Sequence, residues 1–204
     1  MRLLLFIAAL LLLSCGQNSS ESKKEVLHGD TSKTSATAAQ TTASARDSLF
    51  YTTPDEAVVN ESLKSRYGTK WHVLNDSEAK WMKDAFDYFI VSRRKADPNY
   101  PYIAKGDYNA DGKKDTAAVV TDSLKTTYQV VILLGGGKSL LWKEDILEDA
   151  AISTIPKSDI EGMDGEKTKK VKMKGDGINV EYFEKAAFVL YWDKNNFKRI
   201  QTAD

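Results

Sequence analysis

The loop Gly106–Asp115, with the sequence GDYNADGKKD, constrains the fold of this chain more than any other stretch. Counted from Asp107, oxygen-bearing side chains stand at positions 1, 3, 5 and 9, and Gly112 stands at position 6. Alternate side chains of a tightly curled segment converge on one point, and Ca²⁺ prefers carboxylate, amide and backbone carbonyl oxygens as ligands. Lys113, at position 7, offers its backbone carbonyl while its side chain points outward. The loop therefore predicts a calcium site with the ligands Asp107, Asn109, Asp111, Lys113 and Asp115.

The alternative interpretation of this loop is a plain Asp-Gly turn that holds no metal. Asp164-Gly165 and Asp176-Gly177 are two further Asp-Gly turns in the chain, and neither has oxygen-bearing side chains at positions 1, 3, 5 and 9. The spacing around Asp111-Gly112 therefore favours a metal site, while the bare turn stays open as an alternative.

The loop departs from an EF-hand at its end. Position 12 is Ala118, where an EF-hand has a bidentate Glu, and a β-branched run, Thr116–Thr121, follows in place of a second helix. The pattern DxNxDGxxD leading into TAAVV resembles the calcium loop of FG-GAP and VCBS repeats, in which the loop leads into a β-strand. The resemblance implies that Asp115 is the last ligand. Those families usually carry several copies that form a propeller, whereas this chain carries one copy.

The first residues of the chain have the pattern of a secretory signal. Arg2 is followed by the apolar run Leu3–Leu13, which is too short to span a bilayer. The run ends in LLSC at residues 12–15, which resembles the lipobox of bacterial lipoproteins. That resemblance implies cleavage before Cys15 and acylation of this cysteine with a diacyl or triacyl anchor, palmitate included. The alternatives are a cleaved signal with an incidental cysteine and an uncleaved anchor. Because Cys15 is the only cysteine, no disulfide can form within the chain.

The sequence predicts three regions. Residues 1–14 form the signal peptide, and residues 15–48 form the lipidated cysteine with a disordered tether, rich in Ser and Thr and without aromatic residues. Residues 49–204 form a single folded domain. We therefore expect a protein anchored in the cell envelope on the periplasmic or extracellular side. Gly16 follows the expected lipidated cysteine, where an Asp would retain some lipoproteins in the inner membrane, and this weakly favours an outer membrane.

The folded domain has helical patterns first and strand patterns after them. The first helix is expected to begin at Thr53–Glu56, where Thr53 can act as the cap, and to end at Gly68. A second helix is expected over Ser77–Arg94 because apolar residues recur there at helical spacing. These residues, which we expect in the core, are Met82, Ala85, Phe86, Phe89 and Ile90.

Beyond the loop the chain has the pattern of a meander of strands. The expected strands are Thr116–Thr121, Thr127–Leu134, Ser139–Trp142, Thr168–Lys174, Gly177–Glu184, Ala186–Asp193 and Asn196–Thr202. Glu144–Ala151 is ambiguous between a short helix and a loop. The sequence therefore predicts the α+β class, with two N-terminal helices packed on a mainly antiparallel meander sheet.

Charge and residue types narrow the function. The formal net charge is +0 at pH 7, so the chain lacks the excess of positive charge that attracts nucleic acids. We therefore expect no nucleic-acid partner. The folded domain contains one histidine, His72, and no cysteine, which argues against a zinc site and against most nucleophilic triads. Trp142, Tyr182, Tyr191 and Trp192 could line a carbohydrate surface, but aromatic residues in strands are more often core. The sequence therefore favours a protein that is not an enzyme.

Three functions remain open. The first is a lipid-anchored binding or structural module with a structural calcium loop and an unknown protein or glycan partner. The second is an envelope glycan hydrolase that uses a pair of carboxylates. The third is an inhibitor or immunity-type lipoprotein, which would expose an apolar patch. The closing stretch Gly177–Asp204 resembles uncharacterised secreted or lipoprotein domains, and this resemblance implies no activity.

Overall fold

The computed structural model describes residues 51–203. All of these residues belong to one compact unit. The expected signal peptide, the lipidation site Cys15 and the expected tether at residues 15–48 lie outside the described residues. Over residues 51–203, no helix combines the length and the apolar character that crossing a bilayer requires.

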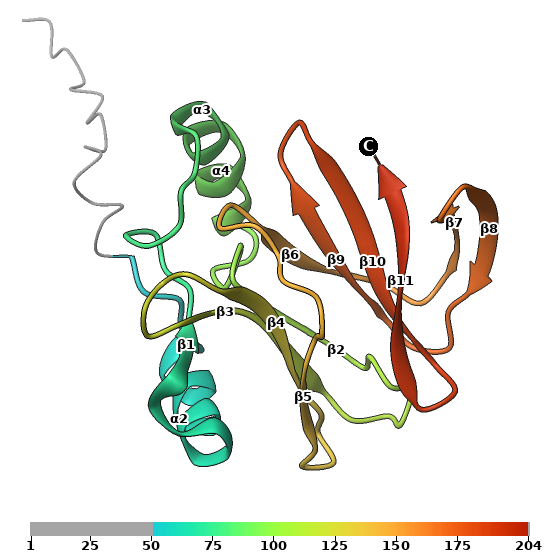
Figure 1. The fold of residues 1–204 in the computed structure, drawn as a ribbon, viewed down its shortest axis with the longest axis horizontal. Coiled ribbons are helices and arrows are strands. Elements are labelled where there is room, and N and C mark those ends of the chain that lie inside the picture. The colour runs from blue at the N-terminus through green and yellow to red at the C-terminus, as the bar shows by residue number, and fades with distance from the viewer. Residues whose placement is uncertain (1–50, 204) are drawn as a thin grey trace, which may run out of the picture. The chain divides into compact units, whose positions relative to one another are not determined.

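The described unit begins with two helical segments and continues with strands (Figure 1). The first segment consists of α2 (Glu56–Tyr67) and the short 3-10 helix η1 (Gly68–Lys70), and it leads into β1 (Trp71–Val73). The second segment is one continuous helical stretch made of α3 (Lys83–Ala85), the π-helical turn η2 (Phe86–Ile90) and α4 (Val91–Arg94). The predicted α+β fold, with two N-terminal helices on antiparallel strands, is confirmed.

The strands form two antiparallel sheets. The first sheet, sheet A, has β3 (Asp115–Asp122) at its centre, with β1 and β2 (Ile103–Gly106) along one edge and β4 (Tyr128–Leu133) and then β5 (Ser139–Leu141) along the other. The second sheet, sheet B, has the order β6-β9-β10-β11-β7-β8. Its strands are β6 (Ala151–Ile155), β7 (Asp159–Asp164), β8 (Lys167–Lys172), β9 (Gly177–Tyr182), β10 (Ala186–Asp193) and β11 (Asn196–Ala203).

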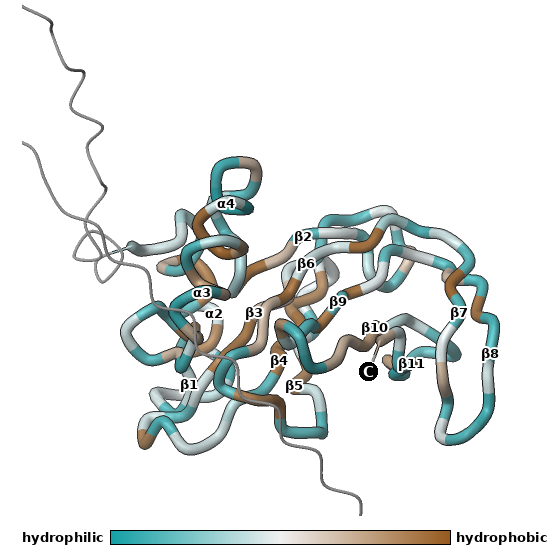
Figure 2. Tube along the Cα trace, turned by 90° about the horizontal axis from the view of Figure 1, so that it is seen from above, coloured by the Kyte–Doolittle hydropathy of each residue, from teal (hydrophilic) through white to brown (hydrophobic). Residues whose placement is uncertain are grey.

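The main core lies between the two sheets and under α2. It includes Val59 and Leu63 of α2, which are one helical turn apart, together with apolar residues of both sheets. The central strand β3 is buried along nearly its whole length, which explains why its sequence TAAVV is continuously apolar and small instead of alternating. Figure 2 shows hydrophobic stretches along β3, β4 and β10, whereas β8 is largely hydrophilic.

A smaller apolar cluster lies on the other face of sheet B, where Met173, Val189, Tyr191 and Ile200 are buried. The β7–β8 hairpin packs Ile160 and Val171 against this cluster. The locally basic strand β8 is therefore half exposed, with Val171 turned toward this cluster.

The second helix begins later than predicted. Instead of starting at Ser77, it starts at Lys83, because Asn75 forms a turn in which its side-chain Oδ1 accepts a hydrogen bond from Ser77 N at 3.0 Å. The neighbouring Asp76 is drawn into a buried ion pair with Arg94 of α4, with an N–O distance of 2.5 Å. These contacts hold the segment before Lys83 as a turn that packs on the helix.

The apolar stripe predicted for this helix is only partly in the core. Ala85 and Ile90 are buried, but Met82 is 50 % exposed and Phe89 is 40 % exposed. The expectation that Met82 and Phe89 belong to the core was wrong. Phe89 is exposed because the π-helical turn η2 has more residues per turn than an α-helix and therefore rotates later side chains away from the expected face. Met82 is exposed because it lies at the N-cap, before the helix begins.

The start of the first helix also differs from the prediction. Its N-cap is Asp55 instead of Thr53, and no side chain caps the helix amides. The Asp55 carboxylate binds the side chains of Asn99 and Lys105, which tie the start of α2 to the segment before β2 and to β2 itself. The strands β2, β6 and β7, which no strong pattern predicted, complete the two sheets.

Candidate metal centre

The loop between β2 and β3 is held in a curled conformation by its own amides. The Asp107 carboxylate accepts hydrogen bonds from Asp111 N and Gly112 N, each at 3.0 Å. Asn109 Oδ1 accepts a further bond from Asp111 N at 3.1 Å, and Asp111 Oδ1 accepts one from Lys113 N at 2.8 Å. Gly112 has a φ of 80°, a conformation that glycine adopts without strain and that reverses the chain direction. The predicted curled loop is therefore present.

Asp115 lies at the base of this loop and is completely buried. Its Oδ2 accepts hydrogen bonds from Tyr108 N at 2.8 Å and Asn109 N at 3.3 Å, and its Oδ1 accepts one from Gly135 N at 2.8 Å. Gly135 lies in the turn between β4 and β5. The Asp115 carboxylate thus joins the loop to the β4–β5 turn of sheet A.

The carboxylates of the loop, Asp107, Asp111 and Asp115, have no lysine or arginine partner in the described part of the chain. Burial raises the pKa of the Asp115 carboxyl, three backbone N–H groups lower it, and the nearby negative charge of Asp111 raises it further. Hydrogen bonds from the Asn109 amide and Lys113 N lower the pKa of the exposed Asp111 carboxyl. The loop therefore concentrates negative charge for which a bound cation would compensate.

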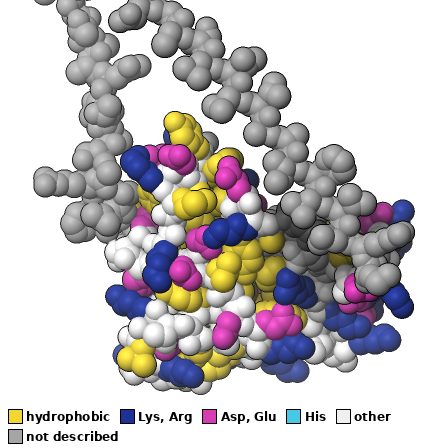
Figure 3. All heavy atoms as spheres, turned by 45° about the horizontal axis from the view of Figure 1, so that its top comes forward, with side chains coloured by type: hydrophobic (Ala, Val, Ile, Leu, Met, Phe, Trp, Pro, Cys, Tyr) yellow, Lys and Arg dark blue, Asp and Glu magenta, His cyan; other side chains and the backbone are white. Residues whose placement is uncertain are grey.

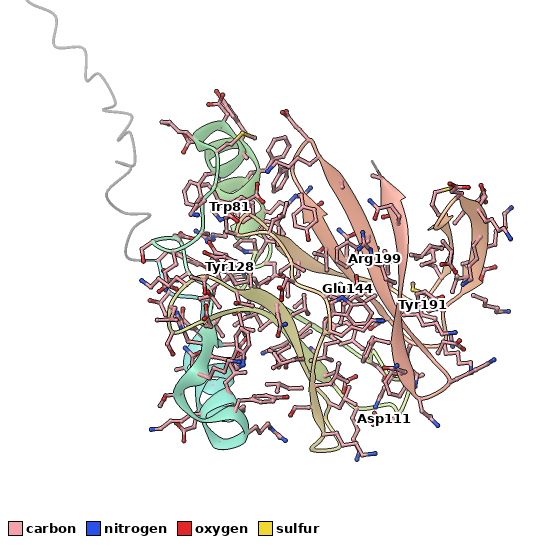
Figure 4. The ribbon with its side chains drawn as sticks, viewed as in Figure 1. Trp81, Asp111, Tyr128, Glu144, Tyr191 and Arg199 are labelled. Atoms are coloured by element: carbon pink, nitrogen blue, oxygen red, sulfur yellow. The ribbon has the colours of Figure 1, made fainter. Side chains whose placement is uncertain are left out.

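The predicted ligands are gathered only in part. Asp107, Asn109 and Asp111 share hydrogen bonds at the mouth of the loop, and the Asn109 amide donates to Asp111 Oδ2 at 3.0 Å. Figure 4 shows Asp111 in this loop, at the lower end of the domain. Lys113 is exposed, so its side chain points outward as expected. Asp115 directs its oxygens at backbone amides.

Over the described residues, no three His, Cys, Asp or Glu side chains form a group that could hold a metal ion. A calcium site in this loop would therefore depend on the Asn109 amide oxygen and the Lys113 carbonyl as well as on carboxylates. All of these donors are oxygen atoms, which suits a hard cation. The calcium site itself remains a prediction.

The structure shows a contact that the sequence pattern did not predict, between the loop and the links of sheet B. Asp107 N donates to Asp176 Oδ2 at 3.0 Å, and Asp176 N donates to Asp107 O at 2.9 Å. Asp176 Oδ1 also accepts a hydrogen bond from Lys157 N, in the link between β6 and β7, at 3.0 Å. The loop is thus a joint between sheet A and the two links of sheet B that precede β7 and β9. Only the Asp176-Gly177 turn signal pointed to this segment.

Gly175 allows the close approach at this joint. A Cβ atom on Gly175 would lie 2.4 Å from the carbonyl oxygen of Asp107 and 3.0 Å from Ala110 N. Both of these atoms belong to the backbone and cannot rotate away. Sequence reasoning could not find this contact, because it joins two segments that are distant in the chain.

The other chemical candidates have structural explanations. His72 Nε2 lies 3.0 Å from Glu78 Oε2, and Glu78 also pairs with Lys125, so His72 is a satisfied strand residue, as predicted. Trp142 and Tyr191 are buried, and both also lie along the wall of a groove between the two sheets.

Comparison of the chain with protein-family models, with curated proteins and with solved structures found no match. The resemblances to lipoproteins and to FG-GAP and VCBS calcium loops therefore rest on their short motifs. Function has to be argued from the loop and from the surfaces of the domain.

The joint gives a first testable prediction. Gly175→Ala should lower the free energy of unfolding by about 1–3 kcal/mol, because its Cβ would overlap the Asp107 carbonyl. The matched control is Gly136→Ala, whose Cβ would meet nothing closer than Asp111 Oδ2 at 3.8 Å. Urea denaturation of both variants measures the difference. Equal stability of the two variants would contradict a tight joint.

Proposed function

We propose that this chain is a lipid-anchored extracytoplasmic protein in which Ca²⁺ binds the loop Asp107–Asp115 and stabilises the joint between the two sheets. In this proposal the domain is a binding or structural module and not an enzyme. The observation that carries the proposal is the geometry of the loop: Asp107, Asn109 and Asp111 meet at its mouth without a cationic partner among the described residues.

Bound calcium would raise the stability of the whole domain because the loop contacts both sheets. The loop contacts Asp176 and, through the buried Asp115, the turn at Gly135. A cation that relieves repulsion among the carboxylates would therefore strengthen contacts of both sheets and not only the loop itself. This is the behaviour of a structural ion. Calcium sites of extracellular modules typically have dissociation constants of about 10⁻⁴–10⁻³ M.

The calcium proposal predicts a calcium-dependent thermal transition. At 10 mM Ca²⁺, dissociation constants in this range would add about 1.4–2.7 kcal/mol to the free energy of unfolding. Asp107→Ala and Asp111→Ala should each abolish the increase, because each removes a ligand at the mouth of the loop. Thermal melts in chelator, in Ca²⁺ and in Mg²⁺ at equal ionic strength measure this response.

The matched control for these melts is Asp164→Ala, which alters another Asp-Gly turn. Asp164 pairs with Lys169 on the β7–β8 hairpin and belongs to no predicted ligand set, so this variant should keep the full calcium response. Equal calcium shifts in wild type and in Asp111→Ala would refute the calcium site and leave a plain turn.

The lipid anchor rests on the sequence LLSC at residues 12–15 and is tested separately. Expressed in a bacterial host, the wild-type chain should incorporate labelled palmitate and remain in the membrane fraction, since two or more acyl chains anchor a protein stably. Cys15→Ser should lose both the label and the membrane fraction. Ser14→Ala, which keeps a small residue before the cysteine, should retain them. Labelled Cys15→Ser protein would show that acylation occurs elsewhere.

A second candidate function is that of a lipoprotein that binds and inhibits one secreted protein. It is favoured by an exposed apolar patch formed by Met82, Tyr88, Phe89 and Phe183, where Tyr88 is 74 % exposed. Phe89 stacks on Phe183 of the β9–β10 turn with 4.6 Å between ring centroids, and a hollow of about 470 Å³ lies beside them. Figure 3, in which the α3–α4 end comes forward, shows hydrophobic side chains gathered on this face.

The second candidate function predicts that the exposed apolar patch binds the partner protein. Cross-linking in the parent envelope should yield one specific protein adduct with the wild-type chain, and Tyr88→Ser with Phe89→Ser should remove it, because exposed apolar patches mark protein interfaces. The control is Leu124→Ser, which changes a single residue that is 79 % exposed in the β3–β4 turn. An adduct that persists in the double variant would exclude the patch as the interface.

A further inference from the structure

A groove opens beside β11, at the position where the β7–β8 hairpin stops covering this strand. Strand β11 pairs with β10 along seven residue pairs, but it pairs with β7 only through Gln201 and Met163. Because β7 ends at Asp164, the first half of β11, Asn196–Ile200, extends past the hairpin. The groove has a volume of about 760 Å³ and is bounded on its other side by Trp142–Glu144. We refer to it as the β11 groove.

The β11 groove is rich in cations. Its lining includes four basic side chains and two carboxylates, which are Lys143, Lys169, Lys198, Arg199, Glu144 and Asp164. Figure 4 shows Glu144 and Arg199 side by side in this region, and their side chains are 3.2 Å apart. The groove therefore presents an excess of positive charge around carboxylates that remain able to accept hydrogen bonds.

The cations of the β11 groove can exchange partners. Arg199 and Lys169 pair with the two carboxylates of the groove, and Lys198 pairs with Asp193 at 2.6 Å. These pairs are exposed to solvent, where an ion pair is weak and a ligand can compete for it. Lys143 forms no ion pair within residues 51–203, and its ammonium group lies 5.9 Å from the centre of the Trp142 ring. The positive charge of Lys143 is thus not neutralised by a carboxylate of the described residues, and it can bind an anionic ligand.

Trp142 supplies an independent observation. It lines the β11 groove and is only 5 % exposed, and its indole Nε1 has no hydrogen-bond acceptor among the described residues. Buried donors are almost always paired in folded proteins, because an unpaired one loses its hydrogen bonds to water. An oxygen atom of a bound ligand would satisfy this donor.

The edge of β11 argues against an added peptide strand. Such a peptide would need free backbone groups along the edge. Phe197 N already donates to the side-chain Oδ1 of its neighbour Asn196 at 2.9 Å. The basic side chains Lys198 and Arg199 also protect the edge, as charged residues do on natural edge strands. The ligand should therefore be recognised by the side chains of the groove.

We propose that the β11 groove binds an acidic oligosaccharide. Its carboxylates would pair with Lys143 and the neighbouring cations, its hydroxyl groups would donate to Glu144 and Asp164, and one of its oxygen atoms would accept the Trp142 N–H. A simple anion offers no donors for Glu144 and Asp164, whereas a uronate-containing saccharide offers donors and acceptors together. The groove volume lies in the range of small-molecule sites and exceeds the needs of a single oxyanion.

Isothermal titration of the full chain in a non-sugar detergent tests this inference. The probes are tetragalacturonate, the neutral cellotetraose and a tetraglutamate peptide, all with chelator present, so that the result does not depend on the calcium loop. Tetragalacturonate should bind, and its affinity should fall as salt rises. Absence of binding by tetragalacturonate, or equal binding of cellotetraose or tetraglutamate, would overturn the proposal.

Two variants locate the binding. Lys143→Gln removes an exposed charge, and Trp142→Phe removes the indole N–H together with the five-membered part of the ring system, so each should weaken tetragalacturonate binding about tenfold. The matched control is Lys70→Gln, since Lys70 also lies over a tryptophan ring, that of Trp71, at 5.0 Å but outside the groove. Thermal melts check that each variant folds. Wild-type affinity in both groove variants would overturn the assignment to the β11 groove.

Discussion

The buried carboxylate of Asp115 is the contact on which the arrangement of the two sheets depends. It fixes the amides of Tyr108 and Asn109 at the base of the loop and the amide of Gly135 at the end of sheet A. With the loop held in this way, Asp107 N donates to the Asp176 side-chain carboxylate and Asp107 O accepts from Asp176 N, so that the links of sheet B are aligned as well. Burying a charge without a cation is unfavourable unless several donors compensate for it, and here three do.

Much of the fold follows from local patterns. The helix at residues 56–67 is indicated by the signals at its two ends, Thr53–Glu56 and Gly68, and strands such as β3 and β10 are indicated by runs of apolar and β-branched residues. The second helix shows the limit of such patterns. Its start depends on Asp76 meeting Arg94 across the turn, and the exposure of Phe89 depends on a π-helical turn, and neither is encoded in the spacing of apolar residues. Strand β6 was missed because its partner β9 is distant in sequence.

The candidate site was predictable to a similar extent. The ligand spacing of Asp107, Asn109 and Asp111 describes a local loop, and the loop curls as expected. Its contacts with Gly175 and Asp176 were not predictable, because they require knowledge of how two sheets meet. The β11 groove was hidden for the same reason, since Trp142 and Lys143 reach β11 from a different sheet. The residues of a local loop are adjacent in sequence, so their spacing can be recognised there. A groove formed by distant segments exists only after the chain has folded.

The contacts of Tyr51 decide how the domain responds to mechanical load. Its hydroxyl donates to Pro98 O at 2.5 Å, and its ring lies 4.1 Å from the guanidinium carbon of Arg94, which also holds Asp76. A pull applied to the N-terminal side of the domain is therefore received first by α4 and its buried ion pair. Arg93 of α4 in turn pairs with Glu181 of β9, and Phe89 stacks on Phe183 of the β9–β10 turn. Tension applied at the start of the described chain would thus load the helical end of the molecule first and reach sheet B through these contacts.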